Sequence, residues 1–522
     1  MARRDADVER DSLEGRSEAD PLLSSDAPVG SPPEDGSDKA FRRTVIAMCV
    51  LFLFIVETSG VIIEPPKLQL MEDIICRDQY PDHLMGVDDG RCKDAEVQKT
   101  LAMVRSWSLS SEMFVPLLVQ IPYGIIADKY GRRIVLFLAL FGCCLQLAWV
   151  MVTRESPSFL VAPGEREANR PCPSVSFPDV FSIWAMLYGS ITYFIGGGGQ
   201  MAVAMLWTIL ADTLPVAERT AVFYQLYAMT LLLGVVVNPI AAMLLNVDPW
   251  IAMWLGFGGL ILGTLATLLV PETVQIRQKA DGSRRRSSVG DCAVPAKSRI
   301  RQAWFAAKND MSHIWRFIFA SKNVMILMAA YTLFSPVKLN ISYNLLQYMT
   351  KRFGLTWSTA TLYSTVINST SVVVLLFMLP MASSLLTKRF GYDVLRRDLL
   401  LARISVLFLV VGSFSLAFAA VPWLFISSLV TTSLGVGFIA LCRALLNAIV
   451  EPHTIATLNT TISTLETLVG LVGAPALGWL LGRGIELGGP WFGLPFLVTA
   501  ICSAFVLVAV IAFKVPNDFA RP

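Results

Sequence analysis

The sequence predicts an all-α membrane protein with about twelve spanning helices. Of its residues, 54% are hydrophobic and only 16% are charged, which is too apolar a composition for a soluble chain of this size. A spanning helix needs roughly 20 mainly apolar residues. Apolar runs of that length lie near 43–64, 101–124, 133–153, 179–208, 221–245, 250–270, 323–346, 357–382, 399–419, 422–445, 459–482 and 491–514.

The distribution of Lys and Arg orients these runs, because basic loops stay on the cytoplasmic side of a membrane. With the N-terminus inside, most of the basic loop residues fall on the inner side, and 65–99 becomes the first outer loop. The long polar stretch 274–321 separates two sets of six runs. The first 42 residues hold no apolar run, so we expect no cleavable signal peptide and a disordered tail. The predicted units are a cytoplasmic tail, a six-helix bundle, a cytoplasmic linker, a second six-helix bundle and a short tail, at 1–42, 43–273, 274–321, 322–515 and 516–522.

A charged turn stands between the second and third runs. It reads Gly124-Ile-Ile-Ala-Asp128-Lys-Tyr-Gly131-Arg132-Arg133 and resembles the signature loop of the major facilitator superfamily, whose form is roughly G-x-x-x-D-R/K-x-G-R-R/K. A weaker copy, Thr387-Lys-Arg-Phe-Gly391, follows the eighth run. Two six-helix pseudo-repeats, as in the major facilitator fold, would leave such an echo.

The resemblance implies that this turn is part of a gate. Asp128 at a helix end can pair with basic groups or with a helix N-terminus and lock the cytoplasmic side; the alternative is a plain turn charge. The gating residues implied are Gly124, Asp128, Gly131, Arg132, Arg133 and, after the fourth run, Asp212.

Two departures from the family pattern limit what the resemblance implies. The fourth run contains Gly196–Gly199 without the arginine that proton-coupled members carry there, so coupling through that residue is unsupported. The fifth run keeps only Gly234 and Pro239 of the drug-antiporter motif. The first loop, from Pro65 to Cys76, resembles that of filamentous-fungal members often found beside secondary-metabolite pathways. It is distantly similar to the proton-coupled folate transporter group.

Carboxylates at membrane depth are functional candidates, because an ionisable group in lipid is costly. Glu57 and Glu64 share one face of the first helix. Since Glu64 precedes Pro65, we expect it in the headgroup zone, which leaves Glu57 as the deeper group. Glu112 and Glu466 are the other candidates. Each of these carboxylates either carries a proton alongside substrate or accepts a hydrogen bond that holds two helices together.

The seventh run carries a polar stripe with helical spacing. Lipid would reject that face, so we expect it to line a cavity, together with Asn368 of the eighth run. Substrate contact and hydrogen bonding between helices are the two alternatives. The stripe consists of Asn340, Tyr343, Asn344 and Gln347.

Cysteines and serines in the loops suggest covalent modification. Cys76 and Cys92 share the first outer loop, where an oxidising exterior would permit a disulfide, and Cys172 in another outer loop leaves the pairing open. Ser287 and Ser288 follow three arginines in the linker. That run is either a phosphorylation site or a positive-inside anchor. The N-x-S/T sequences that could accept N-glycosylation fall in or beside helices, so we expect no glycosylation.

Together these features predict a secondary transporter that moves a small organic molecule by alternating access, with efflux of a secondary metabolite or toxin as the main hypothesis. Uptake of a nutrient or organic anion is one alternative, and a non-transporting sensor is another. No catalytic constellation, metal-ligand spacing or nucleotide-binding motif is present, so we expect neither an enzyme nor a cofactor. The expected partners are the substrate, the lipid bilayer and protons, without nucleic acid, for a monomer in the plasma membrane. An acidic dileucine pattern ending at Leu22-Leu23 makes a vacuolar or endosomal membrane the alternative.

Overall fold

The computed structural model describes residues 36–83, 89–152, 183–214, 216–271, 322–450 and 455–513, and these residues are helical with no strand. The helices are α1 (Gly36–Gln79), α2 (Ala95–Tyr130), α3 (Arg132–Val152), α4 (Gly198–Thr213), α5 (Val216–Val247), α6 (Pro249–Ala266), α9 (Lys322–Leu339), α10 (Leu345–Phe353), α11 (Trp357–Val373), α12 (Leu379–Phe390), α13 (Val394–Phe418), α14 (Pro422–Leu434), α15 (Phe438–Ile449), α16 (Ile455–Leu487) and α17 (Leu494–Ala512). Short 3-10 turns are η1 (Gly90–Lys93), η4 (Ile183–Phe194), η5 (Thr267–Leu269) and η9 (Gly489–Gly493), and π-helical segments are η6 (Asn340–Asn344) and η7 (Val374–Met378). The chain from Val45 onward forms one compact unit.

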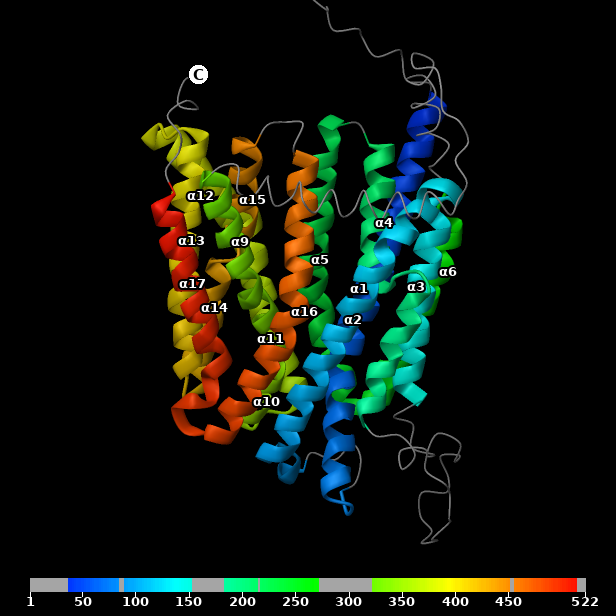
Figure 1. The fold of residues 1–522 in the computed structure, drawn as a ribbon, viewed down its shortest axis with the longest axis vertical. Helices are drawn as coiled ribbons and strands as arrows, with labels where there is room; N and C mark the ends of the chain where they lie inside the picture. Colours follow the sequence, from blue (N-terminus) through cyan, green and yellow to red (C-terminus); the bar gives the residue numbers. More distant parts are fainter. Residues whose placement is uncertain are drawn as a thin grey trace, which may run out of the picture. The chain divides into compact units, whose positions relative to one another are not determined.

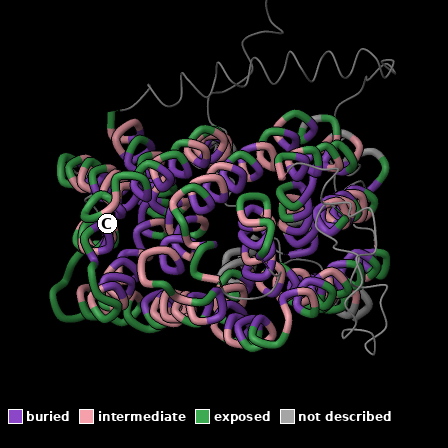
Figure 2. Tube along the Cα trace, turned by 90° about the horizontal axis from the view of Figure 1, so that it is seen from below, coloured by how far each residue is buried: buried purple, intermediate pink, exposed green. Residues whose placement is uncertain are grey.

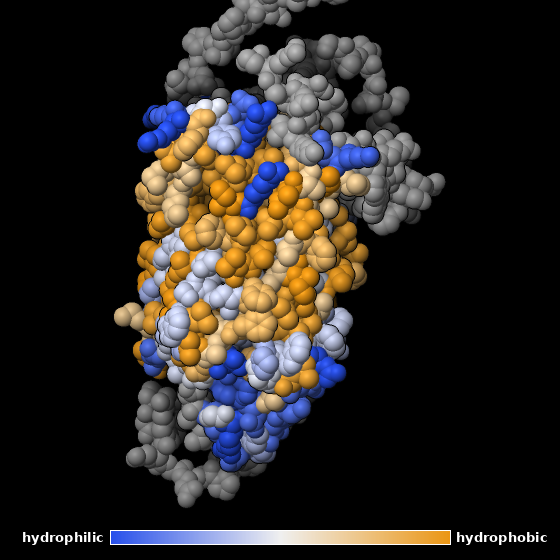
Figure 3. Space-filling model, turned by 90° about the vertical axis from the view of Figure 1, so that its left-hand side faces the viewer, coloured by the Kyte–Doolittle hydropathy of each residue, from blue (hydrophilic) through white to orange (hydrophobic). Residues whose placement is uncertain are grey.

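Eleven helical segments in the described part of the chain are long and apolar enough to cross a membrane. The remaining predicted span falls on α2, which is 36 residues long but carries Arg105, Glu112 and several serines. On the face drawn in Figure 3, hydrophobic side chains cover the middle and hydrophilic ones gather toward the two ends. Large apolar side chains such as Phe414 of α13 and Phe505 of α17 are more than half exposed. An exposed apolar surface of this kind suits the hydrocarbon of a bilayer.

The predicted first loop is wrong. Instead of ending near residue 64, α1 continues through Pro65 and Pro66 to Gln79, and α2 already begins at Ala95. Proline removes a backbone donor and usually ends or kinks a helix. Here the apolar side chains that follow, including Leu68 and Met71, are buried in one cluster with Leu101 of α2. The burial of these side chains outweighs the cost of two prolines within the helix, so the connection between α1 and α2 is shorter than predicted.

Helices that are distant in the sequence pack in pairs. In Figure 1, α2 lies beside α16, and α5 packs along α11. A Cβ added to Gly478 of α16 would come within 2.2 Å of Ser106 Oγ, and one added to Gly234 of α5 within 2.6 Å of Asn368 Nδ2. Small residues permit this close approach between membrane helices. Seen along the helices, exposed residues lie mostly on the outward sides of the bundle (Figure 2).

Glycines end α2 and α12. Gly131 has a φ of 119° and Gly391 a φ of 65°, backbone conformations that other residues adopt only with strain. The N–H of Gly131 donates to the carbonyl of Ala127, and that of Gly391 to the carbonyl of Thr387. The second glycine of the charged turn and the glycine of its echo therefore occupy equivalent helix ends.

The glycine run between η4 and α4 interrupts the helix and allows close packing. Gly196, Gly197 and Gly198 all have positive φ. A Cβ on Gly196 would lie 2.2 Å from the backbone of Leu138. Only glycines allow the chain to press against α3 while it passes from η4 into α4.

Candidate functional site

Four charged side chains of α1 and α2 meet inside the helical unit. Arg105 Nη2 donates a 3.0 Å hydrogen bond to Glu64 Oε1, and Lys67 Nζ lies 3.9 Å from Glu112 Oε1. The Arg105 side chain is only 8% exposed. Charge is balanced across the two pairs, which lowers the cost of holding ions in an apolar interior. We call Glu64, Lys67, Arg105 and Glu112 the central charge cluster.

The central charge cluster lines a cavity of about 150 Å³. Tyr343 of η6 also lines this cavity, and the Arg105 guanidinium carbon lies 5.8 Å from the centroid of its ring. Arg105 and Tyr343 also line a second, very small hollow. The residues around the larger cavity are Glu64, Lys67, Leu68, Met71, Arg105, Ser108, Leu109, Glu112 and Tyr343.

Glu112 accepts hydrogen bonds from its own helix and from a neighbouring one. Its Oε1 accepts hydrogen bonds from Ser108 Oγ at 3.3 Å and from Gln146 Nε2 of α3 at 3.2 Å. With Lys67 on α1, these partners tie three helices to one carboxylate. Glu112 therefore combines the two roles considered for it: it lines the cavity and joins helices.

Glu57 and Glu64 share α1 but differ in their contacts. Glu64 lies 15 residues before the end of α1 at Gln79, and Arg105 binds it. Glu57 is half-buried on α1, and no hydrogen bond or ion pair joins it to another residue in the part of the chain that the structure describes. The structure thus brings Glu64 into the cluster and leaves Glu57 outside it.

The polar stripe of the seventh run splits between two surroundings. Tyr343 and Asn344 line the cavities, whereas Asn340 Oδ1 accepts from Asn344 Nδ2 at 2.9 Å and Asn340 Nδ2 lies 3.5 Å from Thr499 Oγ1 of α17. The π-helical segment η6 begins at Asn340. Its extra residue per turn shifts the helical register, and π segments often occur at functional sites.

Glu466 belongs to a separate cluster. Its Oε1 accepts from Tyr331 Oη at 2.9 Å, and its Oε2 lies 3.6 Å from Arg443 Nη2. Arg443 Nε in turn donates to Tyr331 Oη at 3.1 Å. These contacts join α9, α15 and α16. Asn368 contributes to neither cluster and instead packs over Gly234 between α5 and α11.

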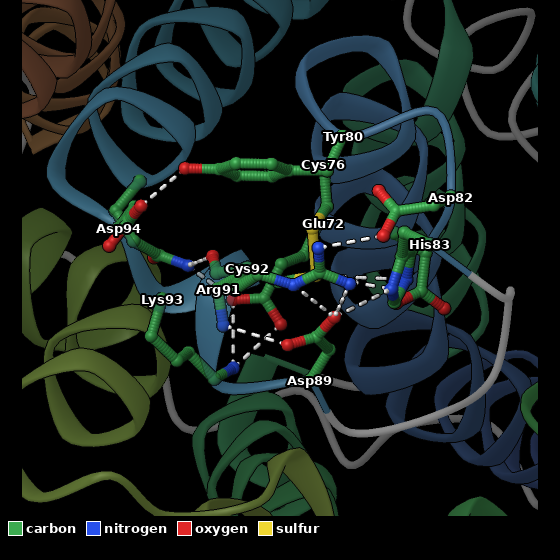
Figure 4. Close-up of a disulfide and its surroundings, with 12 residues drawn as sticks. Glu72, Cys76, Tyr80, Asp82, His83, Asp89, Arg91, Cys92, Lys93 and Asp94 are labelled. Atoms are coloured by element: carbon green, nitrogen blue, oxygen red, sulfur yellow. Dashed lines mark hydrogen bonds and ion pairs between the residues drawn. A yellow bond between two sulfur atoms is a disulfide. The ribbon is translucent and has the colours of Figure 1, made fainter.

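A third polar group closes the end of the bundle at which α1 ends and α2 begins, which we call the disulfide end. Cys76 and Cys92 are joined by a disulfide there. One turn earlier on α1, the buried Glu72 accepts from Lys93 Nζ at 2.6 Å and from Trp357 Nε1 of α11 at 2.7 Å. Gln98 of α2 also donates to Glu72. Figure 4 shows Glu72 and Lys93 beside the disulfide.

This group connects distant parts of the sequence. Gln347 Nε2 of α10 donates to the Gln98 carbonyl at 2.7 Å, and Lys351 Nζ donates to the Lys93 carbonyl. Glu72, Lys93, Gln98, Gln347 and Trp357 form what we call the Glu72 network. It ties α1 and α2 to α10 and α11.

His83 lies against the disulfide. Its ring nitrogens are 3.6 Å from Cys92 Sγ, 3.6 Å from Asp73 Oδ1 and 3.7 Å from Asp89 Oδ2. Ligand atoms of Cys76, His83 and Cys92 fall within 4.8 Å of one another, but the two sulfurs are bonded to each other. Arg91 hydrogen-bonds Asp89 and lowers the pKa of that carboxyl from 3.8 to about 2.

The charged turn connects α3 with its neighbours. Arg132 is buried and its Nη1 donates to the Thr208 carbonyl of α4 at 2.9 Å. Arg133 Nη1 donates to the Leu268 carbonyl of η5 at 3.4 Å. Basic groups commonly bind carbonyls near helix ends. The side chains of Asp128 and Asp212, and the whole of Ser287 and Ser288, lie outside what the structure describes.

The sequence interpretation missed Lys67, Glu72 and Arg105. All three had the same signal as the carboxylates that it selected, an ionisable group next to or inside an apolar run. Lys67 and Glu72 follow Pro65, which predicts a helix end and so places both residues in a loop. Arg105 stands so near the start of its run that membrane depth was not evident.

Comparison with known proteins identifies the family. Residues 102–474 match the family model of the Major Facilitator Superfamily. The efflux pump ustT of Aspergillus flavus is 30% identical over 483 residues, covering 90% of this chain and 88% of that protein. The MFS efflux pump atnC of Emericella nidulans is 27% identical over 523 residues, covering 98% of this chain and 95% of that protein.

Solved structures share the fold. A D-xylose-proton symporter superposes with a TM-score of 0.56 at 14% identity, over 92% of this chain and 99% of that one. The nucleoside transporter NupG superposes with a TM-score of 0.54 at 12% identity, over 90% of this chain and 98% of that one. The match of the family model over most of the chain, together with these relatives, shows that the chain is a membrane transporter of the Major Facilitator Superfamily.

Proposed function

We propose that the protein exports a small organic molecule by alternating access and that the molecule binds in the cavity lined by the central charge cluster. The observation that carries the proposal is this cluster of paired charges around a cavity inside the helical unit. Ionisable groups in that position are costly and mark transport pathways. Relatives across the full length of the chain are named efflux pumps, which supports export.

The gates lie at the two ends of the bundle in this proposal. The Glu72 network closes the disulfide end, taken as the outer side, because it joins helices of the first six-helix set to helices of the second. The turn from Gly124 to Arg133, with Asp128 and Asp212, gates the cytoplasmic side. Residues 43–273 and 322–515 then move as two bundles about the cavity between them.

Protons drive the export in this proposal. The fourth span lacks the arginine of proton-coupled members, so coupling passes through the carboxylates that line the cavity, Glu64 and Glu112. The protein acts as a monomer in the plasma membrane.

The test compares cells with and without the protein. Intracellular accumulation of a broad metabolite panel is measured at two external pH values, with the exposed-surface variant Arg396→Gln as a control that should behave as wild type. Retention of a compound on deletion supports export, and a stronger effect at acidic external pH supports proton exchange. Reduced entry on deletion would instead establish uptake. If no compound changes, the transport proposal fails and a sensor role gains.

A further inference from the structure

We propose that the exported molecule carries a carboxylate, or a similarly compact anionic group, and that the guanidinium of Arg105 binds it. The inference rests on the proposed transport function and names the chemical class of its cargo.

Arg105 is a buried cation with unused donors. Nη2 donates to Glu64, but Nε and Nη1 are buried without a hydrogen-bond partner in the described residues. These two atoms carry most of the guanidinium N–H groups. Buried donors without acceptors are rare and costly. Because Arg105 lines both hollows, an acceptor that enters the cavity can satisfy them.

The geometry of the donors favours a carboxylate. A guanidinium is planar and rigid, and Nε and Nη1 lie on different edges of it. Nη2 has two N–H groups and gives one to Glu64, so a carboxylate can form two parallel hydrogen bonds along the edge that Nη1 shares with the second N–H of Nη2. The Tyr343 ring lies over the same guanidinium and helps to fix its plane. A cationic cargo would meet the unpaired donors of Arg105 and would be repelled by them.

The charges around Arg105 permit an added anion. Lys67 supplies a second cation to the same cavity. Glu112 is occupied by Ser108 and Gln146, whereas the Glu64 side chain is 39% exposed and can give way.

The rest of the wall accommodates an apolar body. Leu68, Met71 and Leu109 line the cavity with Tyr343. Its volume of about 150 Å³ lies below the roughly 300–1,000 Å³ of complete drug-sized ligand sites. In this conformation it therefore fits an acidic head and a small adjoining ring.

The experiment uses the purified full chain in detergent, with cinnamate and benzoate as probes and their methyl esters as neutral counterparts. Binding is measured by titration and by thermal unfolding followed through tryptophan fluorescence. We expect both acids to bind and stabilise the wild type, and the esters to bind about tenfold more weakly or not at all, because they cannot form charge-assisted hydrogen bonds.

Three substitutions locate the binding group. Arg105→Gln should weaken binding of the acids about tenfold or more. Arg105→Lys keeps the charge but loses the planar fork, so it should recover only part of the affinity. Glu64→Gln removes a competing acid and should bind the acids at least as tightly as wild type. Arg396→Gln, which removes an exposed charge paired with Asp393, should leave affinity unchanged.

Any one of three results overturns the inference: no stabilisation of wild type by either acid, equal binding of acids and esters, or wild-type affinity in the Arg105 variants. If Arg105→Gln does not purify as a monodisperse protein, Arg105→Lys and Glu64→Gln decide. Failure of the anion inference is distinct from failure of transport. Cells that retain only neutral or cationic metabolites on deletion would contradict the carboxylate and leave export standing.

Discussion

Trp357 of α11 donates a 2.7 Å hydrogen bond from its indole nitrogen to Oε2 of Glu72 on α1, across 285 residues of sequence. Both side chains are buried. The bond joins the two six-helix sets at the disulfide end, and Lys93 and Gln98 engage the same carboxylate. A buried carboxylate held by a cation and neutral donors is costly to expose or to leave half-paired. The Glu72 network is therefore suited to hold that end closed.

Trp357→Phe should loosen the disulfide end. The substitution keeps an aromatic ring but removes one donor to a buried charge, which costs about 1–3 kcal/mol. We expect faster reaction of a cysteine placed at the buried Leu245, which lines the same hollow as Trp357, with a membrane-impermeant maleimide. Trp423→Phe, at an exposed position of α14, is the matched control. Equal labelling rates in the two variants would show that the Glu72 network does not hold this end closed.

Gly131→Ala and Gly124→Ala should differ although both glycines belong to the charged turn. Gly131 has a φ of 119°, where alanine is strained by about 1–3 kcal/mol. Gly124 lies inside α2, and an added Cβ would meet nothing within 4 Å, so alanine there should be neutral or stabilising by about 0.5–1 kcal/mol. Thermal unfolding of both variants checks this order, and the reverse order would contradict the assignment.

Asp128→Asn should impair transport while leaving membrane insertion intact. If the carboxylate biases a gate, its loss should reduce the transport rate about 5- to 150-fold, the usual range of conformational coupling. Asp393→Asn, at the equivalent turn before α13, removes an exposed carboxylate paired with Arg396 and serves as the control. Wild-type transport rates in Asp128→Asn, at equal surface expression, would show that Asp128 is a charged turn residue without a gating role.

The connection after α1 should tolerate acid. The hydrogen bonds from Arg91 lower the pKa of Asp89 from 3.8 to about 2. A depressed carboxyl pKa stabilises the fold above the ordinary value, and the stabilisation is lost as the pH falls through the lowered one. The pair should therefore persist below pH 4, where an ordinary aspartate is protonated, and be lost as the pH approaches about 2. Limited proteolysis of this connection checks the range, and Arg91→Ala should become sensitive at a higher pH than wild type.

Much of the fold is predictable because its signals are local. The membrane spans follow from apolar runs of sufficient length, and the turn at Gly131 needs only glycine and its neighbours. The first helix is the instructive failure. Pro65 and Pro66 suggested a helix end, but Leu68 and Met71 bury their side chains against α2 and carry the helix on to Gln79. The rule that proline ends a helix considers only neighbouring residues. Here the packing of α1 against α2, which that rule does not consider, decides where the helix ends.

The candidate site is only partly predictable for the same reason. Tyr343 and Asn344 were expected in a cavity; Tyr343 lines both hollows and Asn344 the smaller one. Asn340 and Asn368 were expected on the same wall, yet Asn340 bonds to Thr499 and Asn368 packs over Gly234. Spacing along one helix says which residues share a face, but it does not say which other helix that face meets.

The sequence by itself determined the class of protein, because hydrophobicity and a glycine-bounded charged turn are properties of short segments. Only the tertiary structure decided which ions pair. Arg105 meets Glu64 from a neighbouring helix, and Glu72 meets Trp357 across most of the chain. In an apolar interior a charge is tolerated where another group compensates it, and the identity of that group depends on how the helices pack.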